Sequence, residues 1–147
     1  MILKKKYVIG THVAFFEIEM YEDFINGLLN VLETVDNKEN VIIDLCLNLK
    51  ETLEKLDKEK ISRDTILIKF RQGIKKLKDI GITVNEIVVE DMTLHGTDAL
   101  YFHTDYRRNL NYKYSNLVDY VIFGETDSFM PREGFHAIES LSEYTDS

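Results

Sequence analysis

Apolar runs of strand length alternate along this chain with longer stretches whose apolar residues recur at helical spacing. The runs at 6–16, 41–49 and 82–90 are rich in β-branched and aromatic residues, and a shorter run spans 119–124. Such short, nearly continuous apolar runs are typical of strands buried on both faces. Because right-handed crossovers place a helix between consecutive parallel strands, the pattern predicts an α/β fold. We expect a Rossmann-like, mainly parallel sheet with helices on both faces.

Two of the intervening stretches carry strong helix signals. Apolar side chains recur every three or four residues over 21–34 and over 63–80. Ser62 is a favoured residue for capping the start of the second helix, and Gly81 for ending it. Further helices are expected at 50–58, 107–117 and 131–141, the last opened by Pro131. Residues 91–104 are expected to form a loop.

The length and composition fit one globular domain, 1–147. The chain has 147 residues, of which 44% are hydrophobic and 30% charged, so it can bury a core. Its net charge of -8 disfavours nucleic acid as a partner, because nucleic-acid binding needs basic surface to displace counterions from phosphates. An acidic chain that handles phosphorylated ligands usually needs a divalent cation.

The single cysteine and the short apolar runs bear on the compartment. Cys46 is the only cysteine, so no internal disulfide can form, which fits a reducing environment. Charged or polar residues interrupt every apolar run before the roughly 18 residues that a membrane span needs, and the start of the chain has no signal-peptide core. We therefore expect no integral membrane segment and a cytoplasmic location.

The common phosphate-binding loops are missing. The turn after the first predicted strand has no GxGxxG, no GxxxxGK[ST] occurs anywhere, and there is no GxSxG nucleophile elbow. The remaining way to hold a diphosphate is through a metal ion bound by carboxylates. Glu125 and Asp127 follow the predicted strand at 119–124, are separated by one residue, and in extended backbone point the same way. Their hard oxygen atoms suit Mg²⁺ or Mn²⁺.

The segment from Thr104 to Ser128 resembles the family 2 and related glycosyltransferases of the GT-A fold. In those proteins an Arg-Asn pair opens a helix, the helix leads to a strand, and the strand ends in a DXD metal motif. Here Arg108-Asn109 matches the pair, the residues 119–123 match the strand, and Glu125-Thr126-Asp127 matches the motif. The first Asp of the motif is replaced by Glu, which keeps the carboxylate.

The resemblance implies a GT-A-type core that binds a nucleotide-diphosphate sugar. Asp127 would be the principal metal ligand, with Glu125 as its partner through the metal or the ribose. By the same resemblance, Phe15, Glu17 and Asn48 would lie around the nucleoside.

The two arginines are the expected partners of the diphosphate. At the start of the predicted helix, Arg107 and Arg108 oppose the positive end of the helix dipole, so we expect an anion or acidic group nearby. Either arginine would neutralise the diphosphate. Asn109 is expected to cap that helix or tie down a loop.

The four histidines of the chain and the tyrosines in and near this segment need not be functional. The histidines show no metal-binding spacing and are expected to be structural or exposed. Tyrosines beside a strand usually pack in a core, and we expect this of Tyr101, Tyr106, Tyr112, Tyr114 and Tyr120.

We expect the acceptor side of such an enzyme to be short or missing here. In the family the general base follows the DXD region, where this chain offers only Glu133 and Glu139 as candidates. The acceptor is unknown. The expected function is sugar transfer from a nucleotide-sugar donor, by a glycosyltransferase that holds its donor through Mn²⁺ or Mg²⁺. The alternatives are a non-catalytic donor-binding or interaction module and a sugar nucleotidyltransferase, although the latter normally carries a glycine-rich phosphate loop.

Overall fold

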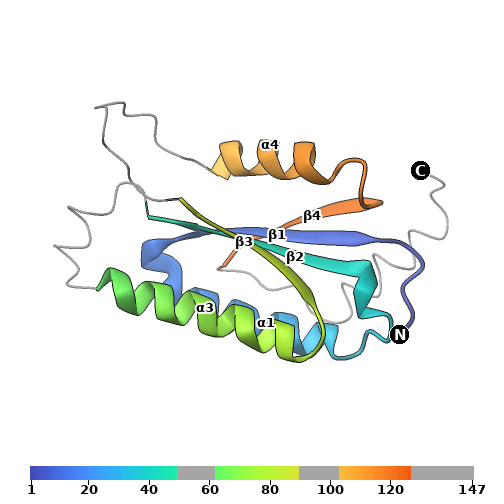
Figure 1. The fold of residues 1–147 in the computed structure, drawn as a ribbon, viewed down its shortest axis with the longest axis horizontal. Helices are drawn as coiled ribbons and strands as arrows, with labels where there is room; N and C mark the ends of the chain where they lie inside the picture. The colour runs from blue at the N-terminus through green and yellow to red at the C-terminus, as the bar shows by residue number, and fades with distance from the viewer. Residues whose placement is uncertain (50–61, 90–102, 127–147) are drawn as a thin grey trace.

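The computed structural model describes residues 1–49, 62–89 and 103–126, which form a four-stranded sheet covered by helices on both faces (Figure 1). The strands are β1 (Tyr7–Ala14), β2 (Val41–Asn48), β3 (Thr83–Val89) and β4 (Tyr120–Gly124). The helices are α1 (Ile18–Leu32), α3 (Arg63–Asp79) and α4 (His103–Tyr114), with single 3-10 turns η1 (Phe15–Glu17) and η2 (Lys38–Asn40). The helices predicted at 50–58 and 131–141, and nearly all of the predicted loop at 91–104, lie outside the described residues.

The sheet is entirely parallel and has the order β3-β2-β1-β4. The predicted Rossmann-like α/β fold is therefore confirmed. The first three strands step in one direction from β1, and β4 pairs on its other side, so the strand order reverses between β1 and β4. In open α/β sheets this reversal leaves a crevice at the carboxyl ends of the strands, where ligands bind. β4 is short: its last residue, Gly124, pairs with Thr11, three residues before β1 ends.

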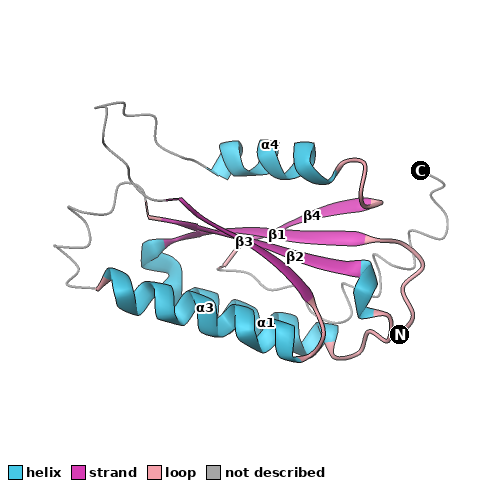
Figure 2. Ribbon diagram, in the orientation of Figure 1, coloured by secondary structure: helices cyan, strands magenta, loops and turns pink. Residues whose placement is uncertain are grey.

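The larger core lies between the sheet and the helices α1 and α3 (Figure 2). Alternate residues of the two central strands point into it, among them Ile9 and Val13 of β1. The Tyr21 hydroxyl crosses between the helices and donates a hydrogen bond of 2.7 Å to the carbonyl oxygen of Phe70. Because its polar atom is satisfied, this large side chain is buried at little cost.

The opposite face is covered by α4 over a smaller cluster of buried residues, which we call the α4 cluster: Val8, Cys46, Tyr106, Leu110 and Tyr114. Gly10 of β1 permits the close approach. A β-carbon at this position would lie 2.2 Å from Leu110 Cδ2 and 2.8 Å from the Tyr106 hydroxyl. Any larger residue at this position would force the side chains of Leu110 and Tyr106 to move.

Several predicted boundaries differ from the structure. The first strand ends at Ala14 instead of continuing to residue 16, because the chain turns through η1 and enters α1 three residues earlier than expected. Helix α4 spans His103–Tyr114 and not 107–117. Arg107 and Arg108 therefore lie in the interior of the helix, where Asn109 cannot be a cap.

The tyrosines of this region divide between core and surface. Tyr106 and Tyr114 are buried, and Tyr120 stacks on Tyr7 with ring centres 5.6 Å apart. Tyr112 is 90% exposed, so its expected core position is wrong. It lies two residues before the buried Tyr114, and that spacing places it on the opposite side of the helix from Tyr114. Among the described residues no helix is both long and apolar enough to cross a membrane.

Candidate functional site

The residues at the end of β4 alternate between the two sides of the sheet. Phe123 packs against the α4 cluster, whereas a β-carbon at Gly124 would lie 3.0 Å from Phe24 of α1. The alternation continues beyond the strand, because Glu125 contacts α4 and Thr126 contacts the turn that precedes α1. Glu125 and Thr126 are therefore held from opposite sides.

Glu125 pairs with Arg107 on the α4 side. The guanidinium Nη2 lies 3.3 Å from Glu125 Oε1, and the guanidinium carbon lies 5.2 Å from the centre of the Phe123 ring. Both charged side chains are about half exposed, at 46% and 51%, so water screens the pair and it adds little to stability. The ion pair matters for position, because it holds the Arg107 guanidinium beside the Glu125 carboxylate at the carboxyl end of β4.

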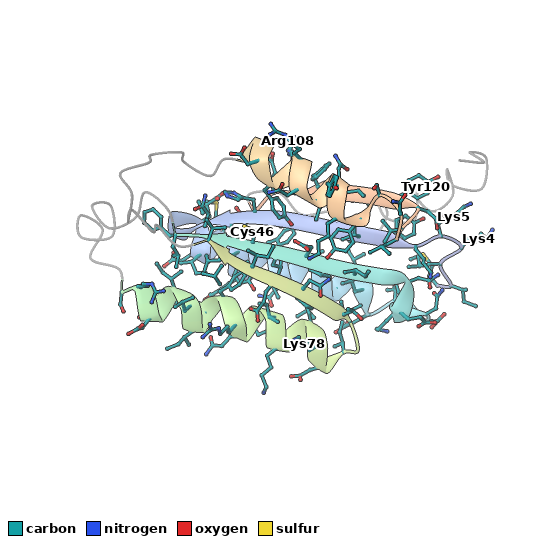
Figure 3. The ribbon with its side chains drawn as sticks, turned by 45° about the horizontal axis from the view of Figure 1, so that its top comes forward. Lys4, Lys5, Cys46, Lys78, Arg108 and Tyr120 are labelled. Carbon is teal, nitrogen blue, oxygen red and sulfur yellow. The ribbon has the colours of Figure 1, made fainter. Side chains whose placement is uncertain are left out.

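Of the two arginines, the structure brings only Arg107 to Glu125. Arg108 is exposed and projects from α4 away from the sheet (Figure 3). In the same view Lys4, Lys5 and Tyr120 mark the opposite end of the sheet, where the strands begin. The acidic partner expected near the arginines is present for Arg107 and is Glu125. The reason given for expecting it was wrong, because Arg107 does not lie at the positive end of the helix dipole.

Glu17 holds Thr126 on the other side. One carboxylate oxygen accepts the backbone N–H of Ala14 at 2.9 Å, and the other accepts the Thr126 hydroxyl at 2.6 Å. Thr126 is buried, with 5% of its surface exposed. The turn after β1 and the turn after β4 are thus joined through one carboxylate.

The other two predicted nucleoside contacts are largely buried. Phe15 is 3% exposed and packs in the larger core. Asn48, at the carboxyl end of β2, is 8% exposed, and its side-chain amide nitrogen lies 3.0 Å from His12 Nε2. Contact of Phe15, Glu17 or Asn48 with a nucleoside stays a prediction.

A buried carboxylate anchors α4 to the centre of the sheet. Asp44 of β2 is 1% exposed, and it accepts hydrogen bonds from the hydroxyls of Tyr106 and Tyr114 at 2.8 and 2.7 Å. Lys113 Nζ lies 3.3 Å from the same carboxylate, and Asn85 of β3 donates to the Tyr114 hydroxyl at 2.7 Å. A buried carboxylate with several donors and a cation is tolerated, whereas an unpaired one is costly.

This network changes the acidity of its members. Burial, together with the charge of Asp44 and the hydrogen bond to it, raises the pKa of Tyr106 well above the ordinary value of 10.0. Burial, with the charge of Asp44 adding to it, also raises the pKa of Cys46 to about 12. Both groups are therefore protonated at neutral pH.

The predicted metal ligands are only partly within the described residues. Glu125 lies at the carboxyl end of β4 with half of its side chain exposed, as a ligand for a hard cation should. Asp127, Glu133 and Glu139 lie outside the described residues. Within 1–49, 62–89 and 103–126, no group of three or more His, Cys, Asp or Glu side chains is placed to hold a metal ion.

No protein-family model matches this chain, and comparison with curated proteins and with solved structures finds no similar protein. The resemblance to glycosyltransferases therefore rests on the sequence motif around Glu125 alone.

Two residues of this region were not anticipated from the sequence. Thr126 is the middle residue of the acidic triplet and looks like a spacer, yet its hydroxyl joins two turns. Asp44 carried a visible signal, because a lone acidic residue inside an apolar strand must find buried partners. The identity of those partners, in a helix about 60 residues further along, was not readable.

Proposed function

We propose that this protein binds a nucleotide-diphosphate sugar through a divalent cation and transfers the sugar to an acceptor. The proposal follows from the position of Glu125. This carboxylate stands at the carboxyl end of β4, beside the reversal of strand order at which α/β sheets bind ligands. Arg107 faces it from α4.

The described residues suit a donor that carries a diphosphate. Glu125 supplies one carboxylate to Mn²⁺ or Mg²⁺, and Asp127 is proposed as the second, principal ligand. The cation would stabilise the charge that builds on the departing nucleoside diphosphate. Arg107 is placed to bind a phosphate oxygen once the donor arrives. Phe15, Glu17 and Asn48 come from the ends of β1 and β2, and the resemblance suggests them as the residues around the nucleoside.

Calorimetric titration tests the proposal. We expect UDP, GDP or a UDP-sugar to bind in the presence of Mn²⁺ and to bind much more weakly without it. Asp127→Ala should reduce the Mn²⁺-dependent affinity at least roughly tenfold, a loss of about 1.4 kcal/mol. Asp23→Ala, which removes an exposed carboxylate of α1, is the matched control and should bind as wild type does. Binding that ignores both Mn²⁺ and Asp127 would retire the glycosyltransferase proposal.

Turnover separates the proposed enzyme from its alternatives. A glycosyltransferase releases nucleoside diphosphate from the bound donor when it transfers the sugar to a supplied acceptor or, more slowly, to water. A non-catalytic donor-binding module binds the donor with the same metal dependence and releases nothing. A sugar nucleotidyltransferase would instead form the nucleotide sugar from a nucleoside triphosphate and a sugar 1-phosphate, with release of pyrophosphate.

A further inference from the structure

We propose that Glu17 is a positioning residue of this site. It fixes the turn at Glu125 and Thr126 through its hydrogen bond to Thr126, and it does not itself bind the cation. This role rests on the proposed function, because the turn matters for binding only if Glu125 and Asp127 hold a metal. It gives Glu17 a task different from the nucleoside contact suggested by the resemblance.

Both oxygens of the Glu17 carboxylate are engaged within the chain. Oε1 accepts the Ala14 N–H at 2.9 Å, which closes the turn η1, and Oε2 accepts the Thr126 hydroxyl at 2.6 Å. The second distance is that of a charge-assisted O–H···O⁻ bond, which is roughly twice as strong as a neutral one. A cation would have to compete with these two donors for the same oxygens.

The pleat of β4 also separates Glu17 from Glu125. Thr126 points toward the α1 side of the sheet, where it contacts Glu17, whereas Glu125 points toward α4 and Arg107. Successive side chains of extended backbone point to opposite faces, so the two glutamates approach the turn from opposite sides. They are poorly placed to share one ion.

The turn needs such support because the strand ladder has already ended. Within the described residues β4 pairs only with β1, and the last pair is Thr11 with Gly124. Glu125 and Thr126 therefore lie beyond the ladder. The Thr126 hydroxyl ties the turn to the start of α1, and Arg107 ties it to α4. Ligands that are fixed before the metal arrives bind it more tightly, because less order is lost on binding.

Three variants separate positioning from direct binding. Glu17→Gln removes the charge, but its amide oxygen can still accept from Ala14 and its amide nitrogen can donate to the Thr126 hydroxyl. Thr126→Val keeps the side-chain shape and removes the hydroxyl, whereas Thr126→Ser keeps the hydroxyl. A residue that acts through another by hydrogen bonding tolerates the first and third changes, but not the second.

The affinity for Mn²⁺, alone and together with UDP or GDP, is the first measurement. We expect Thr126→Val to weaken Mn²⁺ binding about tenfold, the lower end of the effect of outer partners of metal ligands. Glu17→Gln and Thr126→Ser should stay within about threefold of wild type on the same scale. If Glu17→Gln loses as much affinity as Glu125→Ala, Glu17 is a direct ligand and the proposal is wrong. Melting temperatures show that each variant is folded.

The backbone order of Glu125 and Thr126 in the metal-free protein is the second measurement. In wild type, NMR order parameters of these two amides should be near 0.85, and Thr126→Val should lower them below about 0.6. Unchanged order parameters would overturn the positioning role. If wild type binds neither Mn²⁺ nor nucleotide, the proposed function fails, and with it the role of Glu17 toward a cation. The order parameters would still establish whether Glu17 and Thr126 hold the turn.

Discussion

Neighbouring residues in this protein can have entirely different surroundings. Arg107 packs over Phe123 and pairs with Glu125, while Arg108 is directed into solvent from the same helix. Their difference follows from helical geometry, because adjacent residues are rotated by about 100° around the axis. The sequence alone left both arginines as candidates for binding a diphosphate.

These two arginines form a matched pair for substitution. Arg107→Ala should reduce affinity for UDP or GDP in the presence of Mn²⁺ by roughly 10- to 100-fold, since hydrogen bonds to charged groups contribute about 1.5–3 kcal/mol. Arg108→Ala should change it little. Neither change should alter the free energy of unfolding by more than about 1 kcal/mol, because Arg108 is exposed and the half-exposed ion pair of Arg107 is screened by water. Calorimetry and urea denaturation measure the two quantities, and equal losses of affinity would contradict the assignment to Arg107.

At the scale of elements, α4 is attached differently from α1 and α3. The latter bury a broad apolar surface against the sheet, whereas α4 combines a small apolar cluster with hydrogen bonds to the buried Asp44. Those bonds need protonated tyrosine hydroxyls, because a phenolate has no proton to donate to a carboxylate. The attachment of α4 should therefore weaken at alkaline pH.

We expect the free energy of unfolding to fall as the pH rises above about 10. In the unfolded chain Tyr106 loses its proton near its ordinary pKa of 10.0, whereas in the folded protein burial and Asp44 keep the pKa well above that value. The folded state then binds more protons than the unfolded state, so the contribution of Tyr106 to stability is complete below pH 10 and decreases above it. Each such group contributes a slope of about 1.4 kcal/mol per pH unit.

Urea denaturation between pH 8 and pH 11 checks this expectation. Folding also raises the pKa of Cys46, Tyr21 and Tyr114, so these three groups add to the wild-type slope. Tyr106→Phe should therefore reduce the slope without abolishing it. Tyr112→Phe, at a 90% exposed position of the same helix, is the control and should leave the slope unchanged. An equal slope in wild type and Tyr106→Phe would mean that Tyr106 titrates alike in both states.

For the whole molecule, the fold was far more predictable than the site. The parallel strands were readable because sheets buried on both faces need continuous apolar runs. Helix α3 begins after Ser62, whose hydroxyl oxygen lies 3.5 Å from the Thr65 amide nitrogen, and ends before Gly81 at φ +93°, as local signals predict. Short-range chemistry decides both features, so the sequence carries them.

The features that failed depend on contacts between distant segments. The first strand was expected to continue through Phe16, but the turn at η1 is held by Glu17, which contacts a residue 109 positions away. The start of α4 was missed because its buried residues, Tyr106, Leu110 and Tyr114, include two tyrosines whose hydroxyls are satisfied by β2. Local periodicity cannot identify Thr126 as the partner of Glu17 or Asp44 as the partner of the two tyrosines.

Because the one cysteine, Cys46, is buried beneath α4, the rate of its chemical labelling reports how often α4 moves away from the sheet. A thiol-specific reagent attacks the thiolate, and Cys46 is fully covered with a pKa raised to about 12. Labelling at pH 8 should therefore be at least roughly 100-fold slower than in the urea-unfolded chain, because it waits for α4 to lift. Tyr106→Phe should accelerate labelling, and Mn²⁺ with a bound nucleotide should slow it by holding Arg107 at the site. A rate equal to that of the unfolded chain would show that this layer is open most of the time.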